Sequence, residues 1–141
     1  MAKNATWSNA ERSAMMNAII ADFNSGYLEL YDSTGTGQPA GPDTAVTTQR
    51  LLSTLRFPAT AFVSVVNGVA TAGVIVSDPS AALTGTATWY RCYKSDGVTA
   101  LHDGSIGTAT SNLILPTVAV AAGDVVSVSS FVLTEAAASA Q

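Results

Sequence analysis

The segment 86–107, TATWYRCYKSDGVTALHDGSIG, concentrates the side chains of this chain that could do chemistry. It contains the only cysteine, Cys92, and the only histidine, His102, and Asp103 and Ser105 lie close behind it. A thiol beside an imidazole makes a nucleophilic dyad, and Ser, His and Asp are the residue types of a catalytic triad. Whether these groups form a site depends on the strands that carry them.

The spacing within this segment does not favour a triad. Neighbouring residues of a strand point to opposite faces of a sheet, so His102 and Asp103 cannot orient one another. The chain also lacks the Gly-x-Ser-x-Gly sequence that presents a nucleophilic serine on a strand-to-helix turn. We therefore expect no catalysis by Ser105.

The turn at residues 95–97, Ser-Asp-Gly, determines how close Cys92 comes to His102. If all three residues form the loop, Cys92 faces Ala100 and is only a diagonal neighbour of His102. If the loop is Asp-Gly alone, Cys92 faces Leu101, and the thiol and the imidazole lie on opposite faces. Both registers favour Cys92 as a small buried hydrophobic residue.

Metal and cofactor sites are not predicted either. One Cys and one His leave too few ligands for zinc, and segment 35–41, GTGQPAG, lacks the Lys-Ser/Thr ending of a phosphate-binding loop. Glu29 is the only carboxylate in a predicted strand, because the other candidates fall in predicted turns, where they bond to local backbone: Asp78, Asp96, Asp103 and Asp124. Calcium held by loop oxygens stays open, although no EF-hand loop is present. We expect a non-enzymatic protein without metal or cofactor.

The composition bears on the partners of the protein. The net charge is −4 with a pI near 4.6, and the six basic residues are scattered, so the chain has no basic stripe for nucleic acid. Only 11% of residues are charged while 48% are hydrophobic, which favours an oligomer or a bound partner that covers weakly polar surface. No apolar run is long enough to span a membrane, and no secretion signal is evident, so we expect synthesis in a cytoplasm.

One helix is predicted over residues 8–23. Ser8 and Glu11 form a capping box, and apolar residues then recur at spacings of three and four: Met15, Met16, Ile19, Ile20 and Phe23. Two interpretations stay open for this stripe. The helix packs on its own domain, or it is an arm that docks on another subunit through its two adaptable methionines.

From residue 27 onward the pattern changes to short strands separated by turns. A hairpin over 61–76 has Asn67-Gly68 at its turn, and the long Gly/Pro/Thr-rich stretch 32–49 is a loop of the kind that is functional or ordered by a partner. The other predicted strands are 27–31, 50–57, 84–94, 98–103, 112–116 and 124–134. We predict a mainly β protein: an antiparallel β-sandwich or jelly-roll-like domain of about eight strands, with one N-terminal helix. The expected division is an arm and helix (1–26), a sandwich (27–134) and a flexible tail (135–141).

The predicted strand 84–94 has no clearly polar face. Trp89, Arg91 and Tyr93 share one face, and Tyr90 and Cys92 share the other. A strand with one solvated side should be polar there, so one interpretation is that one face lines the core and the other a subunit contact. A plain core strand is the alternative.

The order of segments GYLELYDSTGTGQPAGPDTAVTTQRLLSTLRF, VATAGVIVSD, TGTATWYRCYKSDG, DGSIGT and AAGDVVSVSSFVL resembles a family of small structural proteins encoded among the head genes of tailed bacteriophages. The resemblance covers residues 26–133. Proteins similar to this family act as capsid decoration, or cement, proteins. It implies a protein on the exterior of the virion capsid, made in the host bacterial cytoplasm, that binds the major capsid protein as a homotrimer and stabilises the head by bridging capsid subunits.

Two functional hypotheses follow. The first is this non-enzymatic virion protein, and we assign its oligomer or capsid interface to a set of aromatic, sulfur-containing and basic residues: Trp7, Met15, Met16, Trp89, Arg91, Tyr93 and His102. The second is a carbohydrate-binding β-sandwich for host attachment, with aromatic rings stacked on sugar: Trp7, Trp89, Tyr90 or Tyr93. Another virion component, of the tail or neck, has the same composition and stays open.

Overall fold

The computed structural model describes residues 5–135. The chain begins with helix α1 (Asn9–Ile20), which runs into one 3-10 turn, η1 (Ala21–Phe23). Ten strands follow in the order β1 (Tyr27–Tyr31), β2 (Leu51–Arg56), β3 (Phe62–Val66), β4 (Val69–Ala72), β5 (Gly85–Thr86), β6 (Trp89–Tyr93), β7 (Ala100–Gly107), β8 (Leu113–Ile114), β9 (Ala119–Val120) and β10 (Ser130–Thr134). The prediction of a mainly β protein with one N-terminal helix is confirmed.

Helix α1 begins where the sequence predicts. Ser8 is extended and its hydroxyl accepts a hydrogen bond from the backbone N–H of Glu11 at 3.2 Å, which satisfies a donor of the first turn. Met16 and Phe23 are buried against the sheet. Of the two interpretations left open for the helix, the structure has the first, in which it packs on its own domain.

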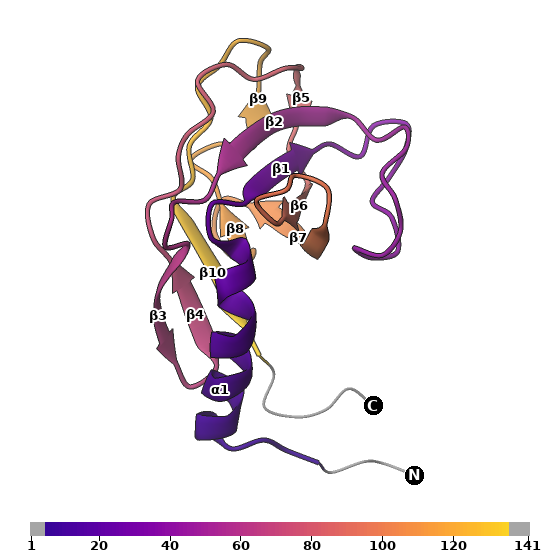
Figure 1. Ribbon diagram of the computed structural model, residues 1–141. Helices are drawn as coiled ribbons and strands as arrows, with labels where there is room; N and C mark the ends of the chain where they lie inside the picture. Colours follow the sequence, from indigo (N-terminus) through magenta and orange to yellow (C-terminus); the bar gives the residue numbers. More distant parts are fainter. Residues whose placement is uncertain (1–4, 136–141) are drawn as a thin grey trace.

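Eight strands form one curled sheet, in the order β2-β1-β6-β7-β8-β10-β4-β3, and β5 and β9 form a separate two-stranded sheet (Figure 1). Helix α1 runs alongside the β3–β4 hairpin. The turn of that hairpin is the predicted Asn67-Gly68, where both residues have positive φ, 52° and 77°. Positive φ at both central positions matches the right-handed twist of the flanking strands.

The sheet has two features that the prediction of an antiparallel sandwich did not include. All eight main strands belong to one continuous sheet, and the β7–β8 pair is parallel, with Ile106 beside Leu113. The connection 108–112 folds back over the end of β7, so the chain enters β8 in the direction in which it left β7. A Cβ atom at Gly107 would lie 2.6 Å from the Ser111 hydroxyl, which shows how closely this connection approaches.

The core joins the two ends of the sheet through aromatic rings. Phe23 of η1 packs edge-on against Phe57 and Phe62, and Phe131 of β10 contacts both of these rings and Tyr90 of β6. The ring centroids lie 5.2–5.9 Å apart, a favourable separation for aromatic pairs. The central strands and the helix therefore share one hydrophobic core.

The strands of the described chain span residues 27 to 134, since β1 begins at Tyr27 and β10 ends at Thr134. The predicted division at 26/27 and 134/135 stays a prediction. The flexible tail predicted for 135–141 lies outside the described residues from 136 onward, as do residues 1–4 of the arm. Among the described residues, no helix has both the length and the apolar character that crossing a membrane requires.

Candidate functional site

A row of three charged side chains crosses the middle of the sheet. Glu29 of β1 pairs in register with Arg91 of β6, and Arg91 pairs in register with Asp103 of β7. Residues that face each other across neighbouring strands point to the same side of a sheet. The row therefore places one guanidinium between two carboxylates on the side of the sheet that carries Tyr31, Trp89 and Tyr93.

Arg91 is the centre of this polar cluster. Its Nε donates to Asp103 Oδ1 at 2.7 Å and its Nη2 donates to Asp103 Oδ2 at 2.8 Å, a bidentate ion pair. The Arg91 side chain is 2% exposed and that of Asp103 is 4% exposed. The hydrogen bonds that Arg91 donates to Asp103 raise the pKa of Arg91, so the guanidinium stays charged at any pH at which the protein is folded.

The same guanidinium holds the long loop 32–49 against the sheet. Nη1 of Arg91 donates to the carbonyl of Thr44 and Nη2 donates to the carbonyl of Gly41, both at 2.8 Å. Arg91 therefore links the loop to β7 through the sheet. The sequence predicts this loop to be functional or ordered by a partner, and in the structure the chain's own side chains fix it.

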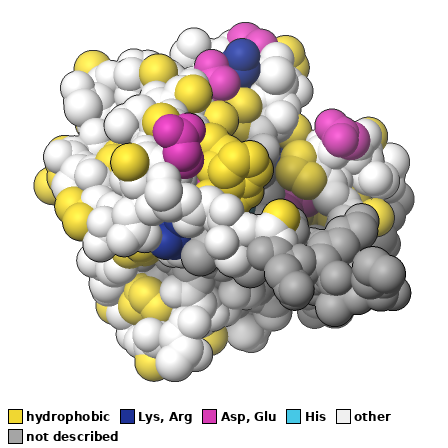
Figure 2. Space-filling model, turned by 90° about the horizontal axis from the view of Figure 1, so that it is seen from below, with side chains coloured by type: hydrophobic (Ala, Val, Ile, Leu, Met, Phe, Trp, Pro, Cys, Tyr) yellow, Lys and Arg dark blue, Asp and Glu magenta, His cyan; other side chains and the backbone are white. Residues whose placement is uncertain are grey.

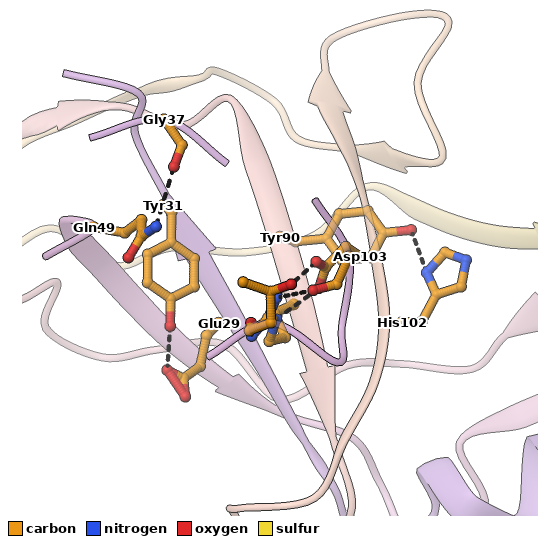
Figure 3. A network of polar contacts seen from close by, with 10 residues as sticks. Glu29, Tyr31, Gly37, Gln49, Tyr90, His102 and Asp103 are labelled. Carbon is orange, nitrogen blue, oxygen red and sulfur yellow. Dashed lines mark hydrogen bonds and ion pairs between the residues drawn. The ribbon is translucent and has the colours of Figure 1, made fainter. Parts of the chain in front are cut away.

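A second anchor closes the base of the loop. Arg50 donates to the buried carboxylate of Asp32 at 2.8 Å, and the same carboxylate accepts the backbone N–H of Thr34. Within the loop, Gln49 donates to the carbonyl of Gly37 at 3.2 Å (Figure 3). The loop is therefore held at two places. Arg50 and Gln49 fix its base, and Arg91 fixes its far part.

Glu29 occupies the other end of the charged row. Tyr31 donates its hydroxyl to Glu29 Oε2 at 3.0 Å, and Figure 3 shows the two side chains pointing at each other. Burial raises the pKa of Glu29, although the Tyr31 hydrogen bond and the charge of Arg91 act in the opposite direction. Burial and the neighbouring Glu29 also raise the pKa of Tyr31, so this phenol stays protonated. The partner of Glu29 thus comes from two residues further along the same strand.

Trp89 packs within the same cluster. Its indole stacks on the ring of Tyr31 with centroids 4.3 Å apart and the planes 11° from parallel. The indole N–H is buried without an acceptor among the described residues. An unpaired buried donor costs about 1–3 kcal/mol, so stacking and burial of the ring must outweigh that cost.

Cys92 and His102 are direct cross-strand partners, on the opposite side of the sheet from Arg91. Both predicted registers are wrong, because a β-bulge between Cys92 and Tyr93 shifts the pairing at the end of the strand. Cys92 is fully buried, as the sequence predicts, and burial raises the pKa of its thiol well above the ordinary value. Desolvation lowers the pKa of His102, whose Nδ1 lies 3.2 Å from the hydroxyl of Tyr90 (Figure 3). A protonated thiol beside a neutral imidazole is not an activated nucleophile.

The assigned interface residues divide into exposed and buried groups. Trp7 is 51% exposed, and Met15, Tyr93 and His102 are half-buried. Met16, Trp89 and Arg91 are at most 2% exposed. These three side chains pack inside the single subunit. The assignment of the interface as a whole stays a prediction. Met16 fills the core, Trp89 stacks on Tyr31, and Arg91 holds the loop.

Burial also reduces the number of aromatic rings that could bind a sugar under the carbohydrate hypothesis. Trp89 is 1% exposed and Tyr90 is fully buried, so neither ring can stack on a sugar. Of the four rings in that hypothesis, Trp7 and Tyr93 remain.

The aspartates mostly occupy the turns that the sequence predicts. Asp96 accepts the backbone N–H groups of Val98 and Thr99, and Asp124 accepts that of Ala121. Asp103 is the exception: it lies within β7, which continues to Gly107, and pairs with Arg91. In residues 5–135 no three His, Cys, Asp or Glu side chains gather as metal ligands.

No protein-family model, curated protein or solved structure matches this chain.

Proposed function

We propose that this protein is a non-enzymatic structural component of a virion, bound to the outer surface of the capsid as an oligomer. The observation that carries the proposal is the use of Arg91 and Asp103 as an internal clamp on loop 32–49. The most reactive-looking segment of the chain thereby serves to fix a surface loop. A binding surface that is ordered before association loses less conformational entropy when its partner binds.

The surface chemistry supports a protein that associates with other proteins. Charged side chains are few on the face drawn in Figure 2, and hydrophobic side chains lie among polar ones there. Several valines and Trp7 are among the exposed large hydrophobic residues. Depletion of charge is a property of the centres of protein–protein interfaces.

The resemblance in segment order is our reason for proposing a virion protein, its position on the capsid exterior and its trimeric state. In that arrangement the partners are the major capsid protein and further copies of this chain. A modest affinity at each contact accumulates when one oligomer spans several capsid subunits. We assign the outward-facing part of loop 32–49, around Ala45, to the capsid contact, since Arg91 fixes the neighbouring Thr44.

The test uses heads of the encoding phage that lack this protein. Added protein should sediment with these heads and raise the temperature at which they release DNA. Ala45→Glu, which adds a charge to the exposed loop, should weaken retention at least tenfold, and Ala109→Glu, also in an exposed turn, should not. A protein that fails to bind the heads at any ratio would contradict the proposal, and equal retention of both variants would contradict the assigned contact.

A further inference from the structure

The two outer strands of the main sheet, β2 and β3, have differently covered edges. Segment 76–83 lies along the outer edge of β2. Arg56 and Val76 exchange two backbone hydrogen bonds, of 3.3 and 2.8 Å, and Ala82 donates to the carbonyl of Leu52 at 2.8 Å. Asp78 adds a side-chain cover, because its Oδ2 accepts from the backbone N–H of Thr54. The edge of β2 is therefore closed by the chain itself.

The outer edge of β3 carries no such cover in the described part of the chain, where β4 is its only partner in the sheet. The two-residue turn makes Val66 and Val69 the first pair that exchanges hydrogen bonds within the hairpin. The next pair, Val65 with Ala70, is then a non-hydrogen-bonded pair. The N–H and C=O of Val65 consequently point away from β4, toward the open edge.

The stretch of chain that carries this edge has no charge of its own, although Arg12 of α1 lies against Gly68 at the hairpin turn. Residues 57–77 include no Asp, Glu, Lys, Arg or His. Val63, Val66, Val74 and Val76 are all more than half exposed. Natural proteins usually protect an open edge with lysine, proline or a bulge, and here the only such device in β3 is a bulge between Phe62 and Ser64, outside the stretch 64–66.

We propose that the open edge of β3 pairs with the same edge of a second copy of this chain. The covered edge of β2 blocks head-to-tail extension of the sheet, so the edge that one copy offers to another is β3 itself. Pairing of a strand with its own copy is antiparallel and twofold, and it closes at two chains. Residues 57–77 carry no acidic side chain, so the strands of two copies of a net negative protein meet here without facing carboxylates of that stretch.

The geometry defines the register of this pairing. The two Val65 residues exchange their outward N–H and C=O groups, and Ser64 of each copy then faces Val66 of the other. The exposed valines beside the strand add apolar contact around these hydrogen bonds. The inference does not depend on the proposed capsid role, since it concerns the free protein.

The first measurement is the mass of the purified full-length protein by light scattering between about 1 μM and 1 mM, the range of weak contacts. We expect the mass to rise to two subunits, or to six if the trimer contact also forms. A mass of one subunit, or of three, throughout this range would overturn the inference. The amide of Val65 should exchange hydrogen more slowly at the higher concentration.

Two variants test the edge directly. Val66→Lys places a charge at the edge strand, and Val65→Pro removes the outward N–H; each should weaken association at least tenfold. Thr71→Lys is the matched control, because Thr71 is also exposed but lies on β4, one strand inward. The association of this variant should match that of the wild type. Val66→Lys changes an exposed side chain, so it remains informative if Val65→Pro impairs folding. Association that is unchanged in Val66→Lys would overturn the inference.

Discussion

The β1–β6–β7 part of the sheet and the β3–β4 hairpin are held together and covered by different kinds of contact. The first buries a charged row, satisfies it with a bidentate ion pair, and covers it with loop 32–49. The second has no charged residue and is covered on one side by helix α1, with valines exposed on the other. Directional contacts hold one region and apolar packing holds the other. The first should therefore be sensitive to single polar changes, and the second should tolerate them.

The largest effect is expected from Asp103→Ala. This change leaves the charge of Arg91 buried without its partner, and breaking a buried ion pair in this way costs about 3–5 kcal/mol of unfolding free energy. Urea denaturation measures the loss. The exposed pair of Lys94 and Asp22 is the control, and Asp22→Ala should cost less than about 1 kcal/mol. Equal losses in the two variants would show that Arg91 does not depend on Asp103.

Asp78→Ala should have the next largest effect. Its carboxylate accepts from the hydroxyl of Ser53 at 2.7 Å and from two backbone N–H groups, those of Thr54 and Ser80. Loss of these bonds at the β2 edge should cost about 1–3 kcal/mol, again by urea denaturation. Asp43→Ala, a change of an exposed loop carboxylate, should leave stability within about 0.5 kcal/mol. If Asp78→Ala behaves like Asp43→Ala, segment 76–83 is held by its backbone bonds alone.

A smaller effect should come from pH, through Glu29. Its pKa is raised in the folded protein, so the folded state binds this proton more tightly than the unfolded state does. The contribution is present below the ordinary glutamate pKa of about 4.3 and is lost as the pH rises through the higher folded value. Wild-type stability relative to Glu29→Gln should therefore fall as the pH rises above the ordinary glutamate pKa of about 4.3.

Thermal unfolding of the two proteins across this pH range provides the test. His102, whose lowered pKa has the opposite effect on stability, is common to both proteins and cancels in the difference. A stability difference that is independent of pH would contradict burial as the dominant influence on Glu29.

The smallest effect is expected from an exposed valine just after the β3–β4 hairpin, which ends at Ala72. Val74 is 86% exposed, so Val74→Ser should change the unfolding free energy by less than about 0.5 kcal/mol. The adjacent Ile75 is buried, and Ile75→Ala should cost about 2–5 kcal/mol. A loss for Val74→Ser near that of Ile75→Ala would mean that the exposed valines are packed within the subunit.

Local features of this fold could be predicted from the sequence. The alternation of residue types predicts a strand at residues 27–31, and β1 has these same bounds. Asn67-Gly68 predicts the hairpin turn, because few residues accept positive φ. Ser8 and Glu11 marked the helix start. In each case a short stretch of chain determines its own geometry, so neighbouring residues carry the whole signal.

Features that depend on distant residues could not be predicted in the same way. The pairing of β1 with β6 joins residues some sixty positions apart, and the sequence of β1 alone does not indicate which strand it pairs with. The candidate cluster was missed for a related reason: the predicted strand ended at Asp103, which placed that carboxylate in a turn instead of opposite Arg91. The bulge beside Cys92 leaves no mark in the sequence, so neither predicted hairpin register was right.

The position of β10 has a consequence for how the chain acquires its fold during synthesis. Strand β10 lies between β8 and β4, although it follows all the other described strands in the chain. Before residues 130–134 leave the ribosome, the ribbon β2-β1-β6-β7-β8 and the hairpin β3–β4 share no strand neighbour in the main sheet. We therefore expect the nascent chain to hold two separate sheet fragments until β10 joins them in a late, long-range step.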